Sequence, residues 1–135
     1  RIYVCGGSLD CHTVLDSTEC FDPDYNVWTT IVPLQVARHG ASLGVIHGVL
    51  YICGGWGRED KALSCAERLD PSSKGSATWE QCDSLSRPRS WSGAGVLGGV
   101  MYVCGGQDRS TPLRSVERIE PGKGVWEAAP PMKES

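Results

Sequence analysis

The chain of 135 residues lacks the features of several large protein classes. No apolar stretch approaches the roughly 20 residues that a membrane-spanning helix requires, so we expect no membrane association. Lysine and arginine (13) are fewer than aspartate and glutamate (16), and the formal net charge is −3. Nucleic-acid binding usually needs a basic surface, so we expect no nucleic-acid partner. With 40% apolar residues, the composition is that of a globular domain large enough to bury its own core.

The sequence also lacks a recognisable metal motif. Its seven cysteines include no C-x-x-C pair, and the "CH" at 11–12 has no further ligands beside it, so we expect no metal and no cofactor. Three cysteines occupy the same place in a repeated hexapeptide and should lie too far apart to bond to one another: Cys5, Cys53 and Cys104. The others share no spacing: Cys11, Cys20, Cys65 and Cys82. We expect free thiols in a reducing, cytoplasmic compartment, in preference to a disulfide framework.

What the sequence does contain is one hexapeptide written three times. "IYVCGG" at 2–7, "LYICGG" at 50–55 and "MYVCGG" at 101–106 each end an apolar run with two glycines. A glutamate and an acid–proline turn follow each copy, as in "ERLDP" at 67–71, and then a tryptophan. The landmarks that recur are the glycine pairs Gly6–Gly7, Gly54–Gly55 and Gly105–Gly106; the tyrosines Tyr3, Tyr51 and Tyr102; the glutamates Glu19, Glu67 and Glu117; and the tryptophans Trp28, Trp79 and Trp126. A period of about 50 residues predicts a repeat architecture.

Each unit reads as four short strands. In the second unit we expect them at 41–46, 49–53, 64–69 and 78–82, with turns at 47–48 and 71–75. In the third unit we expect them at 93–97, 100–104, 115–119 and 125–129. No segment shows helical periodicity. Four-stranded antiparallel meander sheets at this spacing predict the blades of an all-β propeller.

These landmarks together resemble the kelch repeat over essentially the whole chain. The resemblance implies a single domain, 1–135, with one blade at 1–33, a second at 34–84 and a third at 85–135. The first blade lacks its first strand, so we expect eleven strands and an incomplete ring, half of a propeller. Propellers close with about 4 to 8 blades. We therefore expect either a segment of a longer propeller or two copies that pair into a six-bladed ring.

We expect the repeated residues to build the blade and to perform no chemistry. The glycine pairs end a strand where φ becomes positive and neighbouring backbone comes close. The tyrosines and tryptophans are large enough to fill the space between blades. Glu67, which precedes a turn, is expected to accept hydrogen bonds from backbone or arginine.

Candidate binding residues follow from the meander order, which places two sets of connections on one rim. These connections are residues 32–40 and 83–92, which join successive blades, and residues 8–15, 56–63 and 107–114 within blades. Eight of the thirteen basic residues fall on this rim when Lys133, which follows the last expected strand, is counted with it: Arg38, Arg58, Lys61, Arg87, Arg89, Arg109, Arg114 and Lys133. We predict a partner-binding surface there, made by Arg38, His39, Trp56, Arg58, Arg89, Trp91, Gln107 and Arg109.

Within this set, the resemblance gives Arg38 and Arg89 the leading role. Each precedes the repeated tyrosine by 13 residues, and in similar kelch adaptors arginines at that position ring the central channel and grip carboxylates of a peptide. Surface arginines that cap blade edges are the alternative. Trp56 and Trp91 lie outside the repeat. We expect Trp56 to be exposed and Trp91 to fill the channel or pack on a neighbouring blade, with hot-spot roles as the alternative.

The expected function is therefore protein–protein interaction with an acidic partner, without enzymatic activity. The resemblance implies service as the substrate-recognition part of a ubiquitin-ligase adaptor, or, as a second possibility, actin binding. The alternative class is a kelch-type enzyme or sugar-binding protein. A copper radical site lacks converging histidines, whereas Arg38 and Arg89 would also suit a sialic-acid site.

Overall fold

The protein is built from antiparallel β-sheets laid side by side. Its structure is a computed structural model that describes residues 1–10, 12–73 and 77–134. These residues form thirteen strands. Within the described ranges no helix is long and apolar enough to cross a membrane. The expectation of an all-β fold is confirmed.

Three sheets follow one another along the chain, each a meander in which consecutive strands pair. The first contains β1 (Ile2–Ser8), β2 (Val14–Asp22) and β3 (Val27–Ile31). The second contains β4 (Ser42–Ile46), β5 (Val49–Cys53), β6 (Ala66–Leu69) and β7 (Glu80–Cys82). The third contains β8 (Gly93–Leu97), β9 (Val100–Cys104), β12 (Val116–Ile119) and β13 (Trp126–Ala129). A small hairpin joins β9 to β12 and contains β10 (Gln107–Asp108) and β11 (Thr111–Pro112).

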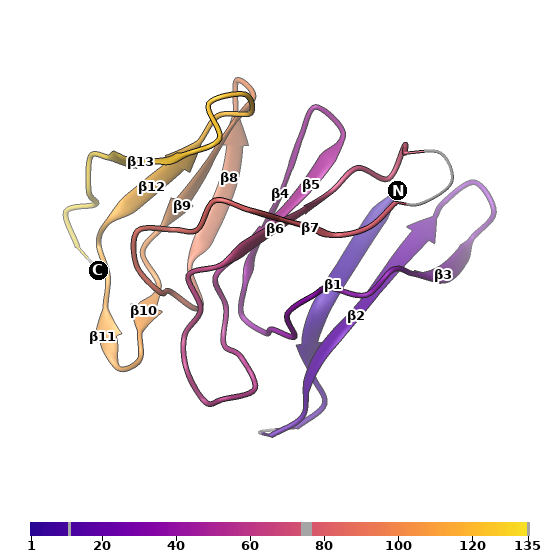
Figure 1. Ribbon diagram of the computed structural model, residues 1–135, viewed down its shortest axis with the longest axis horizontal. Coiled ribbons are helices and arrows are strands. Elements are labelled where there is room, and N and C mark those ends of the chain that lie inside the picture. Colours follow the sequence, from indigo (N-terminus) through magenta and orange to yellow (C-terminus); the bar gives the residue numbers. More distant parts are fainter. Residues whose placement is uncertain (11, 74–76, 135) are drawn as a thin grey trace.

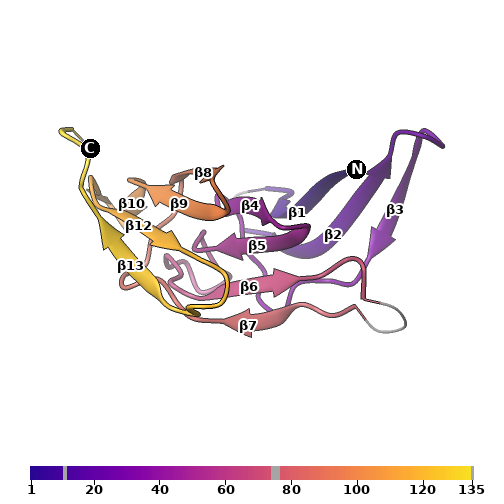
Figure 2. The same ribbon diagram turned by 90° about the horizontal axis from the view of Figure 1, so that it is seen from above.

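The sheets form an open arc. Figure 1 shows them as a fan that runs from β3 at one end to β13 at the other. Seen from above, β1, β4 and β8 lie along the inner side of the arc, and β3, β7 and β13 lie toward its outer side (Figure 2). This is the arrangement of propeller blades, and the ring is not closed.

Strand positions agree with the sequence pattern, with one addition. The strands expected in the second and third units are present within two residues of their predicted starts. The first sheet has three strands, so the eleven expected strands are present and the β10–β11 hairpin adds two more. Part of the predicted turn at 71–75 lies outside the described residues.

Two apolar clusters hold neighbouring sheets together. The cluster between the first and second sheets is built around Leu34, Leu50 and Trp79, with Tyr3 packed against it. The cluster between the second and third sheets includes Tyr51 and Met101. The repeated aromatic residues therefore fill the space between sheets, as expected, wherever a neighbouring sheet is present.

The glycine pairs occupy positions that a side chain would disturb. All six of the repeated glycines have positive φ. A Cβ on Gly106 would lie 2.5 Å from the carbonyl oxygen of Ser90, and one on Gly55 would lie 2.9 Å from that of His39. At these two glycines the connection between sheets passes close to the strand end and leaves no room for a side chain. Positive φ and close backbone are the two reasons for which glycine was predicted here.

Candidate functional site

The connections that were expected to share a rim do lie together. His39 and Trp56 exchange backbone hydrogen bonds of 3.0 and 2.7 Å, and Ser90 and Gln107 exchange two of 2.9 Å. Each pair joins a connection between sheets to a loop within a sheet. In Figure 1 the β10–β11 hairpin lies at the same end of the sheets as the loop between β5 and β6. The loop at 8–15 joins them, since the backbone N–H of Arg38 donates to the carbonyl oxygen of Leu15 at 3.0 Å. The predicted connections therefore lie together among the described residues, and we call them the loop rim (residues 8–10, 12–15, 32–40, 56–63, 83–92 and 107–114).

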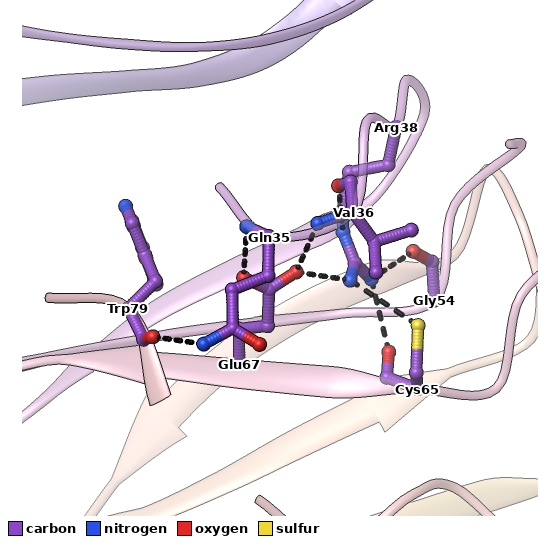
Figure 3. Close-up of polar contacts among 7 residues, drawn as sticks. All are labelled: Gln35, Val36, Arg38, Gly54, Cys65, Glu67 and Trp79. Atoms are coloured by element: carbon purple, nitrogen blue, oxygen red, sulfur yellow. Dashed lines mark hydrogen bonds and ion pairs between the residues drawn. The ribbon is translucent and has the colours of Figure 1, made fainter. Parts of the chain in front are cut away.

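Arg38 lies inside this rim and not on it. Its guanidinium is fully buried and forms an ion pair of 2.6 Å with Glu67, which is also fully buried. The same guanidinium donates to the carbonyl oxygens of Gly54 (2.8 Å) and Cys65 (2.9 Å). Glu67 accepts two further bonds, from the backbone N–H groups of Gln35 (2.7 Å) and Val36 (3.1 Å). Figure 3 shows this cluster, which we call the arginine–glutamate clasp.

The third sheet contains a second copy of the clasp. Arg89 is fully buried, pairs with Glu117 at 2.6 Å and donates to the carbonyl oxygens of Gly105 and Ser115, both at 3.0 Å. The backbone N–H of Ser86 donates to Glu117 at 2.7 Å. The prediction that Arg38 and Arg89 grip a partner therefore needs correction. Arg38 is held in place by the carboxylate of Glu67 and Arg89 by that of Glu117, so Glu67 accepts hydrogen bonds from backbone and arginine as expected.

Exposed cations remain on the rim after this correction. Arg58 pairs with Asp16 at 3.2 Å, Arg87 reaches Asp108 at 3.7 Å, and Lys61 pairs with Glu59. All three are surface ion pairs, which contribute little to stability and exchange readily for other partners. Three further exposed cations have no ion pair among the described residues: Arg109, Arg114 and Lys133.

Two shallow pockets flank the loop at 56–63. One, of about 460 Å³, lies between this loop and the β10–β11 hairpin and is lined by Lys61, Pro88, Asp108 and Arg109 among others. The other, of about 380 Å³, lies on the opposite side and is lined by Gln35, Arg58 and Lys61 among others. Lys61 therefore borders both pockets, and each pocket is also lined by an arginine, Arg109 in the first and Arg58 in the second.

Comparison with known proteins identifies the repeated unit. The family model of the Kelch motif matches residues 1–35, 37–86 and 88–133. The chain belongs to the kelch-repeat family. Two F-box/kelch-repeat proteins of Arabidopsis thaliana are 36% identical over 102 residues and 35% identical over 91 residues. Kelch-like ECH-associated protein 1B of Danio rerio is 34% identical over 115 residues.

These kelch relatives are much longer than the chain. The three alignments cover 73%, 67% and 85% of this chain but 21%, 23% and 19% of the relatives, in the same order. The similarity therefore concerns the kelch repeats themselves, and about four-fifths of each relative's length lies outside the match.

Of the two tryptophans of the kelch rim, Trp56 departs from the prediction and Trp91 follows it. Trp56 is half-buried, not exposed, because its backbone pairs with His39 and its indole N–H donates to Asp60 at 3.0 Å. Trp91 is 60% exposed and has a positive φ of 58°. Its ring packs edge-on against His39, with centroids 5.4 Å apart, and covers Gly40. Trp91 thus packs on the neighbouring kelch unit, as expected, yet keeps most of its surface open.

The cysteines of the kelch units are buried or half-buried free thiols. Six are free among the described residues, and Cys11 lies outside them. Burial raises the pKa of Cys53 to about 12 and that of Cys5 and Cys82 to about 11. These thiols are protonated at neutral pH and are poor nucleophiles.

The described residues of the kelch units contain no group of three or more His, Cys, Asp or Glu side chains that could hold a metal ion. The sequence "GASLG" at 40–44 matches the G-x-S-x-G pattern of a nucleophilic serine. Ser42 lies in strand β4, is buried and forms a hydrogen bond of 3.0 Å to the carbonyl oxygen of Ser92. It is therefore not at the exposed strand-to-helix turn that this motif requires.

Proposed function

We propose that the loop rim binds a segment of a partner protein that carries acidic side chains. The observation that supports this most is the 460 Å³ pocket between Lys61 and Arg109. Arg109 has no ion pair among the described residues, and its positive φ of 55° holds it at the tip of the β10–β11 hairpin. A guanidinium in such a place is free to bind a carboxylate through two parallel hydrogen bonds.

Trp91 adds an apolar contact elsewhere on the same rim. It is a large, exposed side chain whose ring is held by His39 and Gly40, so a partner would not have to immobilise it on binding. Tryptophan and arginine dominate the binding energy of many interfaces. We therefore assign the binding surface to Arg58, Lys61, Trp91 and Arg109, with His39, Trp56 and Gln107 as its support.

We also propose that the rim works as the recognition part of a larger protein or complex. The Arabidopsis relatives are F-box/kelch-repeat proteins. A role in a ubiquitin-ligase adaptor of the cytoplasm fits this combination. Two copies of the chain would supply six blades, within the range in which propellers close, and would place six rim segments around one channel.

The test is a titration of the chain with an acidic peptide by isothermal calorimetry. The matched ligand carries glutamine for each glutamate, and free sialic acid serves as the sugar arm. We expect the acidic peptide alone to bind, with Arg109→Ala and Lys61→Ala each weakening it about 5- to 30-fold. The control Arg118→Ala removes an exposed arginine on β12, away from the rim, and leaves affinity unchanged. Equal binding of both peptides, or binding of sialic acid alone, would contradict the proposal.

A further inference from the structure

The pocket of about 460 Å³ between the second and third sheets has more hydrogen-bond donors in its lining than one carboxylate needs. It lies between the loop at 56–63 and the β10–β11 hairpin, which Figure 1 shows at the same end of the sheets. Two of its lining residues carry a positive charge, Lys61 and Arg109, and two carry a hydroxyl group, Ser110 and Thr111. A single guanidinium satisfies a carboxylate through two parallel hydrogen bonds. The ammonium group and the two hydroxyls therefore exceed the needs of one carboxylate.

Arg109 occupies a backbone position that arginine disfavours. It is the first residue of the two-residue turn between β10 and β11, and its φ is 55°. Glycine, asparagine or aspartate usually takes such a turn position, because a longer side chain is crowded at positive φ. Strained residues of this kind gather at ligand clamps. The turn therefore points to a role for this guanidinium at the tip of the hairpin, beyond that of holding the turn.

The donors of the pocket are open to a ligand. Within the ranges that the structure describes, the hydroxyls of Ser110 and Thr111 make no hydrogen bond. Lys61 pairs with Glu59, and both side chains are more than half exposed, so this ion pair exchanges readily for another partner.

The carboxylate of Asp108 also lines the pocket, and a second cation offsets its charge. The guanidinium of Arg87 lies 3.7 Å from this carboxylate. The two charges of Asp108 and Arg87 cancel at the edge of the pocket, so Lys61 and Arg109 determine its sign. The pocket is therefore a positively charged site with hydroxyl donors beside the charges.

The equivalent place between the first and second sheets has a different lining. Arg58 and Arg109 are each the third residue after a repeated glycine pair. The residue that follows is Glu59 in one loop and Ser110 in the other. Arg58 also pairs with Asp16 at 3.2 Å. The same arginine is thus accompanied by carboxylates at one junction and by hydroxyls at the other, so only the second junction suits a ligand with several acceptor oxygens.

We infer that the pocket between the loop at 56–63 and the β10–β11 hairpin binds a phosphorylated side chain of the partner segment. The inference rests on the proposed function of the loop rim and names the group that this pocket recognises. A phosphoryl group carries a charge of about −1.5 to −2 at neutral pH and three strong acceptor oxygens. The Arg109 guanidinium binds two of these oxygens. Lys61 balances the additional charge, and the hydroxyls of Ser110 and Thr111 donate to the third oxygen.

An NMR titration of the labelled chain with side-chain analogues tests the inference. The probes are the N-acetyl amides of phosphoserine, glutamate and serine, with inorganic phosphate as a fourth. We expect phosphoserine to shift the backbone amide signals of Lys61, Arg109 and Thr111, and to bind about 10-fold more tightly than glutamate. The serine analogue should shift none of these signals. Binding of inorganic phosphate without binding of phosphoserine would assign the pocket to the free ion and overturn the inference.

Variants separate the hydroxyls from the charges. The double variant Ser110→Ala with Thr111→Val keeps both cations, so it should weaken phosphoserine about 5- to 10-fold and leave glutamate within about twofold. Both residues are exposed, so the variant removes no buried contact. Arg58→Ala removes the equivalent arginine of the other junction, and the ratio of the two Kd values should stay the same. Arg118→Ala, which lies away from the rim on β12, is the neutral control.

The outcomes distinguish this inference from the proposed function. Equal affinities for phosphoserine and glutamate, or an equal loss of both in the double variant, would overturn the phosphoryl site and leave the acidic-partner function intact. Shifts confined to rim residues outside the pocket would do the same. If no anionic probe binds at the pocket, the inference is wrong, and the peptide titration described above then decides the proposed function by itself.

Discussion

The first and second sheets carry the same repeat in different surroundings. Glu67 is the centre of a buried clasp, and Trp79 lies under a connection that closes over it. Glu19 and Trp28 occupy the same positions in the repeat, and both are exposed. The difference shows that the residues of one kelch sheet do not form a buried core by themselves. The connection from the preceding sheet supplies the arginine, the two N–H groups and the carbonyl oxygen that make the repeated residues a core.

The largest difference between the two sheets is expected at the repeated glutamates. Glu67→Gln leaves the Arg38 guanidinium buried without a counter-charge, which should lower the free energy of unfolding by about 3–5 kcal/mol. Glu19→Gln should change it by less than about 0.5 kcal/mol in the dilute chain, because this carboxylate is solvated. Urea unfolding followed by circular dichroism measures both values. Similar losses in the two variants would show that Glu19 also has a structural partner.

The repeated tryptophans should differ less. Trp79→Phe removes buried volume and leaves the Val32 carbonyl without its donor, with an expected loss of about 2 kcal/mol. Trp28→Phe removes atoms that are half exposed and should cost less than about 0.5 kcal/mol at the same dilution. The comparison is made by the same urea titrations. A loss at Trp28 as large as that at Trp79 would contradict the exposure of Trp28.

The second glycine of each pair gives a finer comparison. Gly7 and Gly55 have φ of 118° and 97°, so alanine strains the backbone at both. Only at Gly55 would the new Cβ also meet other atoms, at 2.9 Å from the His39 carbonyl oxygen and 3.0 Å from the Cβ of Ala41. Nothing lies within 4 Å of a Cβ on Gly7. Gly55→Ala should therefore lose about 1–2 kcal/mol more than Gly7→Ala, measured as the difference in thermal unfolding.

The smallest expected difference is in the response to alkaline pH. The pKa of Cys53 is raised to about 12 and that of Cys5 to about 11, from 9, in both cases mainly by burial. The folded state therefore binds these protons more tightly than the unfolded state, and stability falls as pH rises above about 9. Up to about pH 10 both thiols stay protonated in the folded state, so the fall should be the same in Cys53→Ala and in Cys5→Ala. Between about pH 10 and 12 the fall should be shallower in Cys53→Ala, because the thiol that remains, Cys5, also ionises in the folded state there. Urea midpoints at about pH 9, 10, 11 and 12 provide the check, and equal slopes above about pH 10 would contradict it.

The sequence pattern was sufficient to predict the strands, the rim and the glycines. A period of about 50 residues with fixed landmarks determines strand order, and a meander then determines which connections share a side. The repeated glycine pairs were sufficient to predict positive φ and close backbone at the strand ends, since few other residues are compatible with both.

The pattern did not reveal what Arg38 and Arg89 contact. Both precede the repeated tyrosine by 13 residues, and a position this regular belongs to the framework, as the other repeated positions do. Arg38 precedes Glu67 by 29 residues and Arg89 precedes Glu117 by 28, so the pairing was itself repeated. The β10–β11 hairpin and the packing of Trp91 on His39 involve residues that are not repeated, and only the folded chain brings them together.

The most direct test of the comparison is the hydrogen exchange of the tryptophan indole N–H groups, followed by NMR in the dilute chain. Trp79 should be protected, because its N–H donates to the carbonyl oxygen of Val32. Trp28 should exchange at the rate of a free indole, because its N–H has no acceptor among the described residues. Equal protection of Trp28 and Trp79 would contradict the claim that the connection from the preceding sheet completes the core of a kelch unit.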